Sequence, residues 1–215
     1  MREYIEISKE KKEKLEQFIR GSLLGDGCIP KKSLKNINFR MAFTHCTEQL
    51  EYLKWKKSLL DEYELGGVVG KYLRVAERFI AGFYIQYVLK SKTHPIFSIF
   101  RDLYYPEGKK LICKEDLVKL DEFGLAIWYM DDGSIWNRKA RSSCLVLYTN
   151  GFTKEDVHFL MKFLLNKWGI KSTYYKCENS IRISSLDTPK FIEIVSPHIV
   201  DCLKYKTQLI KQNKK

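Results

Sequence analysis

The 215-residue sequence lacks an apolar run of the ~18 residues that a membrane-spanning helix needs. Residues 1–14 are charged throughout, unlike the apolar core of a secretory signal. With only five prolines the chain has no proline-rich linker, and no glycine- or serine-rich linker replaces it. We therefore expect a folded intracellular protein without membrane contact. Its host, whether an organelle, a bacterium or a phage, stays open.

Cysteine and histidine are present but do not cluster. The six cysteines form no C-x-x-C pair, and the four histidines include no pair one helical turn apart. Zinc sites and disulfide frameworks both depend on closely patterned spacings. The sequence therefore predicts reduced thiols, and histidines that belong to the core or to the surface.

Basic residues outnumber acidic residues in the sequence. The chain has 38 Lys and Arg residues against 26 Asp and Glu, which gives a formal net charge of +12. A basic folded protein favours a polyanionic partner, most often nucleic acid. A lysine-rich surface that only keeps the protein soluble is the alternative interpretation.

Two segments, residues 19–27 and 125–133, are nearly uninterrupted apolar or small runs that each close with Asp-Gly. Asp26 and Asp132 thus end two expected helices, where the helix dipole disfavours a negative charge by up to ~1 kcal/mol. Two acids at matching positions indicate ligands of a cation, and Mg²⁺ prefers oxygen ligands such as carboxylates. The alternative is that Asp-Gly is ordinary turn chemistry.

The glycines of these segments have two expected roles. Gly27 and Gly133 follow the aspartates, and we expect them to end the helices in the left-handed conformation. Gly21 and Gly25 lie one turn apart on the first helix, where a glycine costs ~1 kcal/mol relative to alanine. Their shared face predicts that a second helix approaches the first one closely.

Hydrophobic periodicity predicts the order αββαββα in each of two halves, residues 1–112 and 113–215. In the first half we expect helices at 9–24 and 47–63 (capped by Thr47), a strand at 36–44 with Ile37 on its buried side, a hairpin within 68–89 and a helix from Pro95. In the second half we expect helices at 116–130 and 153–168 (with a capping box at Thr153 and an end at Gly169), a strand at 143–149, a hairpin over 170–185 and a helix from Pro189.

With these segments and this repeated order, the chain resembles a LAGLIDADG homing endonuclease of the single-chain, two-motif type, closest to the intron-encoded enzymes of yeast mitochondria. The motif copies are Ile19–Gly27 and Leu125–Gly133. The departures from the motif are Arg20, Ser22 and Leu24 in the first copy and Ile127 and Asp131 in the second. They concern helix packing more than chemistry, because both copies keep the acidic position.

The resemblance implies an α+β fold of two pseudo-symmetric αββαββα halves, packed through the two motif helices, with a DNA-binding saddle of antiparallel sheets. It implies a monomer that makes a double-strand break in a long, asymmetric double-stranded DNA site. It assigns catalysis and metal binding to Asp26 and Asp132, with Gly25 and Asp131 as further metal contacts. The expected cofactors are two or more Mg²⁺ ions, for which Mn²⁺ can substitute, because paired metals activate water and stabilise the leaving oxygen.

The family also tends to carry a basic residue near each active site. Lys110 and Lys206 follow Pro95 and Pro189 at similar offsets. We predict that these two lysines polarise water or the scissile phosphate. Contacts to other phosphates of the DNA backbone, or simple exposure to solvent, are the alternatives.

Reading bases in the major groove requires side chains that donate and accept hydrogen bonds. The facing of the strand at 143–149 stays open, because three consecutive apolar residues, 145–147, obscure its alternation and a slip of one residue exchanges the faces. The candidate DNA contacts are Asn36, Asn38, Arg40, Lys71 and Arg74 in the first half and Arg138, Arg141, Lys176 and Arg182 in the second.

Two other functions fit the same pattern. The motif family includes RNA-splicing maturases, whose partner would be intron RNA, and a regulator that binds DNA without cutting it is the second. Both aspartates and the candidate lysines are present, which favours cleavage. Asp26→Asn separates the nuclease from the other two, because only a nuclease loses metal-dependent cutting while it keeps DNA binding.

Overall fold

The computed structural model describes residues 9–31, 37–75, 82–138 and 142–209. The chain forms two compact units. The first unit contains residues up to 15 and 26–108, and the second contains residues 16–25 and 109–215. Helix α1 (Lys9–Leu24), which has the predicted bounds, therefore contributes to both units. The division into repeats at residues 112 and 113 stays a prediction. Among the described residues, no helix has the length and apolar character of a membrane span.

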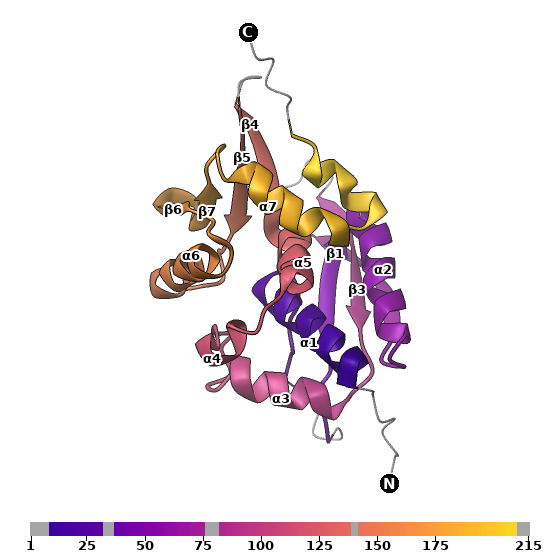
Figure 1. Ribbon diagram of the computed structural model, residues 1–215. Helices are drawn as coiled ribbons and strands as arrows, with labels where there is room; N and C mark the ends of the chain where they lie inside the picture. The colour runs from indigo at the N-terminus through magenta and orange to yellow at the C-terminus, as the bar shows by residue number, and fades with distance from the viewer. Residues whose placement is uncertain (1–8, 32–36, 76–81, 139–141, 210–215) are drawn as a thin grey trace. The chain divides into compact units, whose positions relative to one another are not determined.

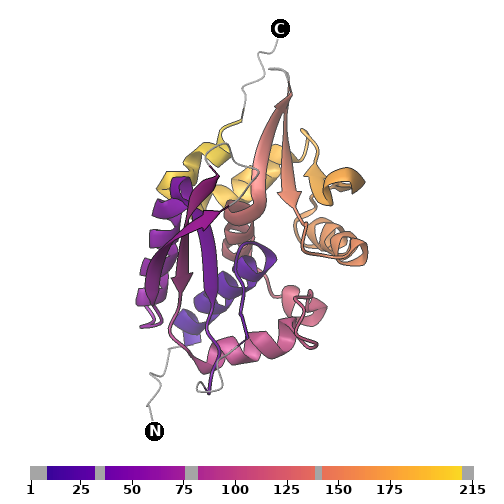
Figure 2. The same ribbon diagram turned by 180° about the vertical axis from the view of Figure 1, so that it is seen from behind.

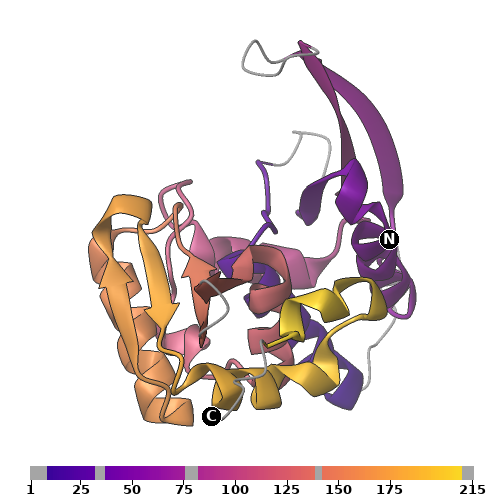
Figure 3. The same ribbon diagram turned by 90° about the horizontal axis from the view of Figure 1, so that it is seen from above.

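The first unit is an antiparallel sheet covered by a helix. Its strands pair in the order β1-β3-β2, and α2 packs against β1 and β3, as Figures 1 and 2 show. Strands β2 and β3 continue as the curved ribbon visible in Figure 3. The elements are β1 (Ala42–Cys46), η1 (Thr47–Gln49), α2 (Leu50–Asp61), β2 (Val68–Val75), β3 (Phe83–Lys90) and α3 (Pro95–Tyr104). Its core includes the fully buried side chains of Phe43, Leu53, Leu89 and Phe97.

The first sheet has three described strands, one fewer than the order αββαββα requires. In the described part of the connection between α1 and β1, Cys28 and Ala42 form an isolated antiparallel bridge, with N–H···O distances of 3.0 and 2.8 Å. The next hydrogen-bonded pair of such a ladder would need an N–H from Pro30, which proline does not have. Ile37 is 85% exposed, so its predicted place on the buried side is wrong.

Two helix predictions also need correction. Thr47 does not cap α2, because it begins the short 3₁₀ turn η1, and the helix starts after Gln49 without a side-chain cap. The helix predicted at 116–130 is broken into α4 (Lys114–Leu117) and α5 (Glu122–Asp132). Asp121 is the N-cap of α5: its side chain accepts a hydrogen bond from Gly124 N–H at 2.8 Å and so starts a new helix.

The second unit shows the predicted order, αββαββα, from α5 to α7. Its four strands pair antiparallel in the order β4-β5-β7-β6, and α6 packs on β6 and β7 (Figure 3). Strand β4 directly follows α5, as this order requires, but no residue range was predicted for it. The remaining elements are β4 (Gly133–Arg138), β5 (Ser142–Tyr148), α6 (Lys154–Trp168), β6 (Ser172–Tyr175), η2 (Lys176–Glu178), β7 (Ser180–Ile183), α7 (Thr188–Val195), η3 (Ser196–His198) and η4 (Asp201–Thr207).

Strand β5 shows which of its faces is buried. Leu145 and Leu147 are fully buried and lie opposite Ile183 and Ile181 of β7. Directly opposed residues share a face, so these four form the inner layer of the sheet; Val146 and Arg182 lie on the opposite face, where Val146 is also buried. Two predicted helix signals are confirmed: α6 has the capping box, and Gly169 ends it with φ of 62°.

Candidate active site

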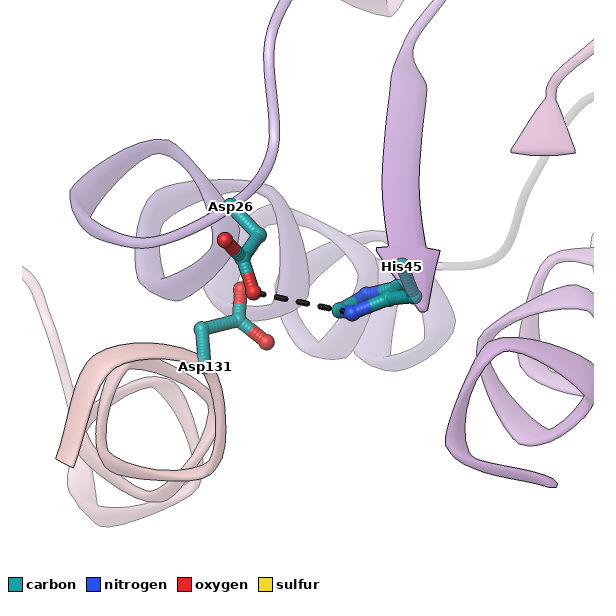
Figure 4. Close-up of side chains that lie close together, drawn as sticks. All are labelled: Asp26, His45 and Asp131. Carbon is teal, nitrogen blue, oxygen red and sulfur yellow. Dashed lines mark ion pairs between the residues drawn. The ribbon is translucent and has the colours of Figure 1, made fainter. Parts of the chain in front are cut away.

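The first motif ends in a tight turn that places Asp26. Helix α1 stops at Leu24, and Gly25 N–H donates to the carbonyl oxygens of Gly21 and Ser22 at 3.2 and 3.1 Å. The Asp26 side chain that follows is 32% exposed. Its Oδ2 lies 3.7 Å from Nδ1 of His45 at the end of β1, the contact drawn in Figure 4. A carboxylate with this exposure can bind a cation without leaving the turn.

The second motif presents two adjacent carboxylates at the end of α5. Asp131, also labelled in Figure 4, is buried with 7% exposure, whereas Asp132 is half-buried. Asp131 lies against Gly25, where an added Cβ would stand 2.7 Å from the Asp131 Oδ2. Gly25 is therefore required for space, because any larger residue would collide with the carboxylate.

The left-handed conformation predicted for Gly27 and Gly133 is wrong. Gly133 has φ of −94° and ψ of 150°, because β4 begins there and the backbone passes directly into an extended strand. The described glycines with positive φ are Gly82, Gly108 and Gly169. A Cβ on Gly133 would meet the ring of Tyr129 and come within 2.5 Å of its carbonyl oxygen. Glycine is needed there because the Tyr129 side chain fills the space.

Both predicted catalytic lysines lie at the ends of the motif helices. Lys110 Nζ donates to the carbonyl oxygen of Gly25 at 3.1 Å, and Lys206 Nζ donates to that of Met130 at 2.7 Å. Cations are favoured at this end, since the last carbonyl groups of a helix carry its partial negative charge. The Lys206 carbonyl also accepts a hydrogen bond from the buried Tyr129 hydroxyl at 2.5 Å, and burial raises the pKa of Tyr129.

The sequence profile of the LAGLIDADG DNA endonuclease family matches residues 16–191. The chain belongs to this family. A probable intron-encoded endonuclease 1 of Wickerhamomyces canadensis is 31% identical over 197 residues, covering 89% of this chain and 82% of that protein. Cytochrome b mRNA maturase bI2 of Debaryomyces hansenii is 29% identical over 208 residues, covering 94% and 76%. The solved structure of the homing endonuclease I-WcaI on its DNA recognition sequence has a TM-score of 0.79 at 29% identity, covering 91% and 86%.

These similarities confirm the resemblance to a single-chain LAGLIDADG homing endonuclease with two motif copies. The fold class is confirmed as well: the chain is α+β, with two antiparallel sheets and helices. As a member of this family the protein is a DNA endonuclease, which hydrolyses phosphodiester bonds. The roles of individual residues stay predictions at this point.

The two LAGLIDADG motif helices pack closely within the second unit. A Cβ on Gly21 of α1 would overlap the carbonyl oxygen of Gly124 and stand 2.7 Å from the Cβ of Ile127 on α5. Gly124 lies just before the second motif copy, and a Cβ there would be 3.1 Å from the Gln17 carbonyl oxygen. The second copy has Ile127 where the motif has glycine, and Gly124, one turn earlier, provides the close approach instead.

We expect Gly21→Ala to destabilise the protein by about 1–3 kcal/mol, the usual cost of overpacking a tight contact. Helix propensity alone predicts the opposite sign, a gain of ~1 kcal/mol. Chemical unfolding of the wild type and of Gly21→Ala gives the sign of the change in the free energy of unfolding. Gly151→Ala is the control, because a Cβ at Gly151 meets nothing within 4 Å. A stabilised Gly21→Ala variant would contradict the close packing of α1 and α5.

Arg20, a departure from the LAGLIDADG motif, forms a buried ion pair that the sequence did not predict. Its Nε and Nη2 each lie 2.9 Å from one oxygen of Asp116 on α4, and Glu16 adds a contact at 3.0 Å. The Arg20 and Asp116 side chains are 4% and 5% exposed. The pair fixes α1 to the segment before α5. No signal in the sequence distinguishes it from the many other Arg and Asp residues.

Four predicted DNA contacts belong to the second unit, and their role stays a prediction. The Arg182 guanidinium lies 3.3 Å from the Tyr175 ring centroid and 5.2 Å from that of Trp136, and Glu178 holds it at 3.1 Å. Trp136 and Arg182 line a hollow of about 350 Å³ together with Cys144 and Thr173. Lys176 is exposed at the neighbouring turn. Arg141 lies outside the described residues, and Arg138 is described only as a backbone position in β4.

The candidates of the first unit are less uniform. Lys71 and Arg74 are exposed on β2, and Arg74 donates to Gln86 Oε1 at 3.1 Å. Asn38 and Arg40 are half-buried, and Asn38 accepts a hydrogen bond from Ser98 at 3.2 Å. Asn36 lies outside the described residues. Lys71 and Arg74 are three residues apart, so they project from opposite faces of β2, and both are more exposed than Asn38 and Arg40.

His45 was expected to be an ordinary core or surface histidine. It is buried, with 2% exposure, but its Nδ1 faces Asp26 and its Nε2 lies 3.2 Å from Lys56 Nζ. The alternating strand pattern indicates that His45 and Phe43 share a face. It does not reveal that this face leads to the motif aspartate, because the contact joins residues from separate elements.

Proposed function

We propose that this protein makes a metal-dependent double-strand break at one long, asymmetric DNA site, acting as a monomer and hydrolysing one phosphodiester bond in each strand. The observation that carries this proposal is the repeated end of the motif. In each copy an aspartate closes a helix, and a lysine binds a carbonyl of that helix end: Lys110 at Gly25 and Lys206 at Met130.

The donors at the motif ends suit a hard divalent cation such as Mg²⁺, because they are all oxygens. Asp26 would hold one ion and Asp132 another, with the Gly25 carbonyl and the Asp131 carboxylate as further ligands. When bound, the ions supply an activated water and neutralise charge at the phosphorus. Mn²⁺ is expected to substitute, since it also accepts carboxylate, carbonyl and water ligands.

Lys110 and Lys206 have a second role in this proposal. An ammonium group has three donors, so a lysine that binds a helix carbonyl can also bind a phosphate oxygen or a water. Each lysine would place positive charge beside the phosphate that its aspartate serves. The carbonyl contact fixes the ammonium before the DNA arrives, which is what electrostatic preorganisation requires.

The outer sheet faces would bind the DNA. Arg182, beside two aromatic rings, and Arg74 on β2 supply donors and positive charge, and the exposed Lys71 adds positive charge from the opposite face of β2. Phosphate contacts should make affinity fall steeply with salt, because binding releases counterions from the DNA. Sequence preference should depend on base-edge contacts and on the ease of bending the site.

The proposal is tested by incubating the purified protein with a plasmid library that carries randomised inserts, in Mg²⁺, Mn²⁺ or EDTA. We expect linear plasmid from a single family of long sites in either metal and none in EDTA. Gel shifts in EDTA should still detect binding to the selected site. Binding without linear product in both metals would refute the nuclease proposal.

A maturase activity is the second candidate, because the Debaryomyces hansenii relative is a cytochrome b mRNA maturase. The same basic sheets would then bind structured intron RNA. The distinguishing assay adds the protein to self-splicing group I intron transcripts and measures the splicing rate. Faster splicing by a variant that carries Asp26→Asn would separate this activity from DNA cleavage.

A further inference from the structure

We propose that Tyr129 is a positioning residue for Lys206, because its hydroxyl holds the backbone of this lysine at the end of the second motif helix. This inference rests on the proposed function, in which Lys206 places positive charge beside a phosphate of the DNA. All of the groups involved belong to the second unit, on α5, α7, η4 and the start of β4. Neither the lysine nor its anchor needs a bound metal to adopt this arrangement.

Two hydrogen bonds of opposite direction join the end of α5 to η4. The Tyr129 hydroxyl donates to the Lys206 carbonyl oxygen at 2.5 Å, and Lys206 Nζ donates to the Met130 carbonyl oxygen at 2.7 Å. The Lys206 carbonyl lies in the last turn of η4, where carbonyl groups lack partners within the helix. A hydroxyl from another element therefore supplies the donor for this backbone group.

The Tyr129 side chain is held in one place by its neighbours. It has no exposed surface, and its ring packs edge to face against Phe191 of α7, with 5.3 Å between the ring centroids. A Cβ on Gly133 would overlap the same ring, so the glycine leaves the space that the ring fills. A ring that is packed in this way carries its hydroxyl to a fixed point, which a positioning residue requires.

A lysine needs such an anchor more than most residues do. Its ammonium sits on a long, flexible stem that loses much rotamer freedom when the charge is held at one point. The Tyr129 hydroxyl holds the backbone end of Lys206, and the Met130 carbonyl holds the ammonium end. Without the hydroxyl one of these two bonds is lost, so η4 and the ammonium can shift relative to the end of α5.

The first motif copy holds its lysine differently. Leu23 occupies the position that matches Tyr129, one helical turn before the final glycine of the motif, and leucine has no hydroxyl to donate. Lys110 instead contacts the Gly25 carbonyl at 3.1 Å and the ring of Phe152, whose centroid lies 5.8 Å from its Nζ. Loss of the Tyr129 hydroxyl should therefore affect only the second centre. A general loss of stability would not distinguish the two DNA strands.

The position of Lys206 is measured without DNA or metal by ¹H–¹⁵N spectra of the lysine ammonium groups. The Lys206 signal is assigned by its absence in Lys206→Met. We expect this signal to be protected from exchange with water in the wild type, because the ammonium donates to Met130. In Tyr129→Phe, which removes only the hydroxyl, the signal should shift and lose protection. An unprotected Lys206 ammonium in the wild type, or an unchanged signal in the variant, would overturn the positioning role.

Tyr174→Phe is the matched control. Tyr174 belongs to the same unit, and its hydroxyl donates to Asn179 Oδ1 at 3.0 Å. It lies on β6 opposite Ile181, on the inner face of the sheet, so the substitution changes no outward-facing residue. The chemical change is the same as in Tyr129→Phe, but the Lys206 signal should match that of the wild type. An equal shift in both variants would contradict a specific link between Tyr129 and Lys206.

Strand-specific cleavage at saturating DNA provides the second readout. Displacement of a catalytic group by about 1 Å can slow a reaction by ~10²-fold. We expect Tyr129→Phe to slow cleavage of one strand by up to this factor, and this should be the strand that Asp132→Asn affects. The other strand should be cut at the wild-type rate, and DNA affinity should not change, because the Tyr129 side chain is buried. Equal slowing of both strands, or of neither, would refute the inference.

A double variant tests whether Tyr129 acts through Lys206. Lys206→Met should slow the same strand, and adding Tyr129→Phe should cause no further loss, because no ammonium remains to be positioned. Losses that multiply would assign Tyr129 an independent role and exclude this one. The ammonium spectra need no cleavage, so the two proposals fail separately. A protein with the Tyr129-dependent signal that cuts no DNA would refute the nuclease proposal while it supports the anchoring of Lys206.

Discussion

Asp26→Asn and Asp132→Asn are each expected to lower the rate of cleavage of one DNA strand by about 10³-fold. A metal that activates water and stabilises charge contributes several kcal/mol, and ~4 kcal/mol corresponds to that factor. The asparagine keeps the size of the aspartate but loses the charge that binds the cation. Because each motif copy has its own aspartate, each variant should accumulate nicked plasmid, and the two should spare opposite strands.

Comparing Asp131→Asn with Asp132→Asn tests which of the two adjacent carboxylates binds the metal. Asp131 is buried against Gly25, whereas Asp132 is half-buried at the last position of α5. We expect Asp131→Asn to cost only about 10–100-fold, as for a group that supports a ligand. The reverse order, with Asp131→Asn the more damaging, would transfer the metal-binding role to Asp131.

The measurement is quantification of supercoiled, nicked and linear plasmid over time, with strand-specific primer extension to identify the nicked strand. DNA affinity in EDTA should not fall in any of these variants, because removing a negative charge does not weaken contact with phosphate. Asp201→Asn is the control, since it neutralises an exposed carboxylate that pairs with Lys204 at 2.6 Å. Wild-type linear product from both motif variants would contradict the assignment of the two centres.

Local signals in the sequence predicted much of the fold. Helix α1 has the predicted bounds because its apolar spacing is regular, and α6 has both its capping box and its left-handed glycine end. These features depend only on neighbouring residues. No residue range was predicted for strand β4, because Gly133–Arg138 has no regular alternation of apolar and polar residues. Its conformation depends on pairing with β5, which local signals do not reveal.

The sequence could indicate candidate site residues where they follow from the repeated motif. It could not indicate those whose place depends on how distant segments pack. Lys110 and Lys206 were chosen because both follow a short helix at similar offsets, and the structure places both at motif helix ends, while their catalytic role stays a prediction. The role of Gly124 required knowing which residues of α1 and α5 meet. His45 required knowing that β1 ends beside Asp26, a contact between distant positions that spacing does not encode.

Arg20→Met is expected to destabilise the protein by about 3–5 kcal/mol, which is a large share of the 5–15 kcal/mol that stabilises a typical domain. The substitution leaves the Asp116 carboxylate buried and charged without its bidentate partner. Burial acts to lower the pKa of Arg20, but the hydrogen bonds and charges of Asp116 and Glu16 outweigh it and raise that pKa. The guanidinium therefore stays charged, and the loss reflects the charge left behind on the aspartate.

A double-mutant cycle separates this penalty from the value of the pair itself. Asp116→Leu alone should also be strongly destabilising, whereas Arg20→Met combined with Asp116→Leu should recover most of the stability, because it buries no uncompensated charge. Denaturant unfolding gives the four free energies. Lys54→Met is the control, because Lys54 and Glu51 form an exposed pair at 2.7 Å that should contribute less than ~1 kcal/mol. Additive effects of the two core substitutions would show that Arg20 and Asp116 do not act as a unit.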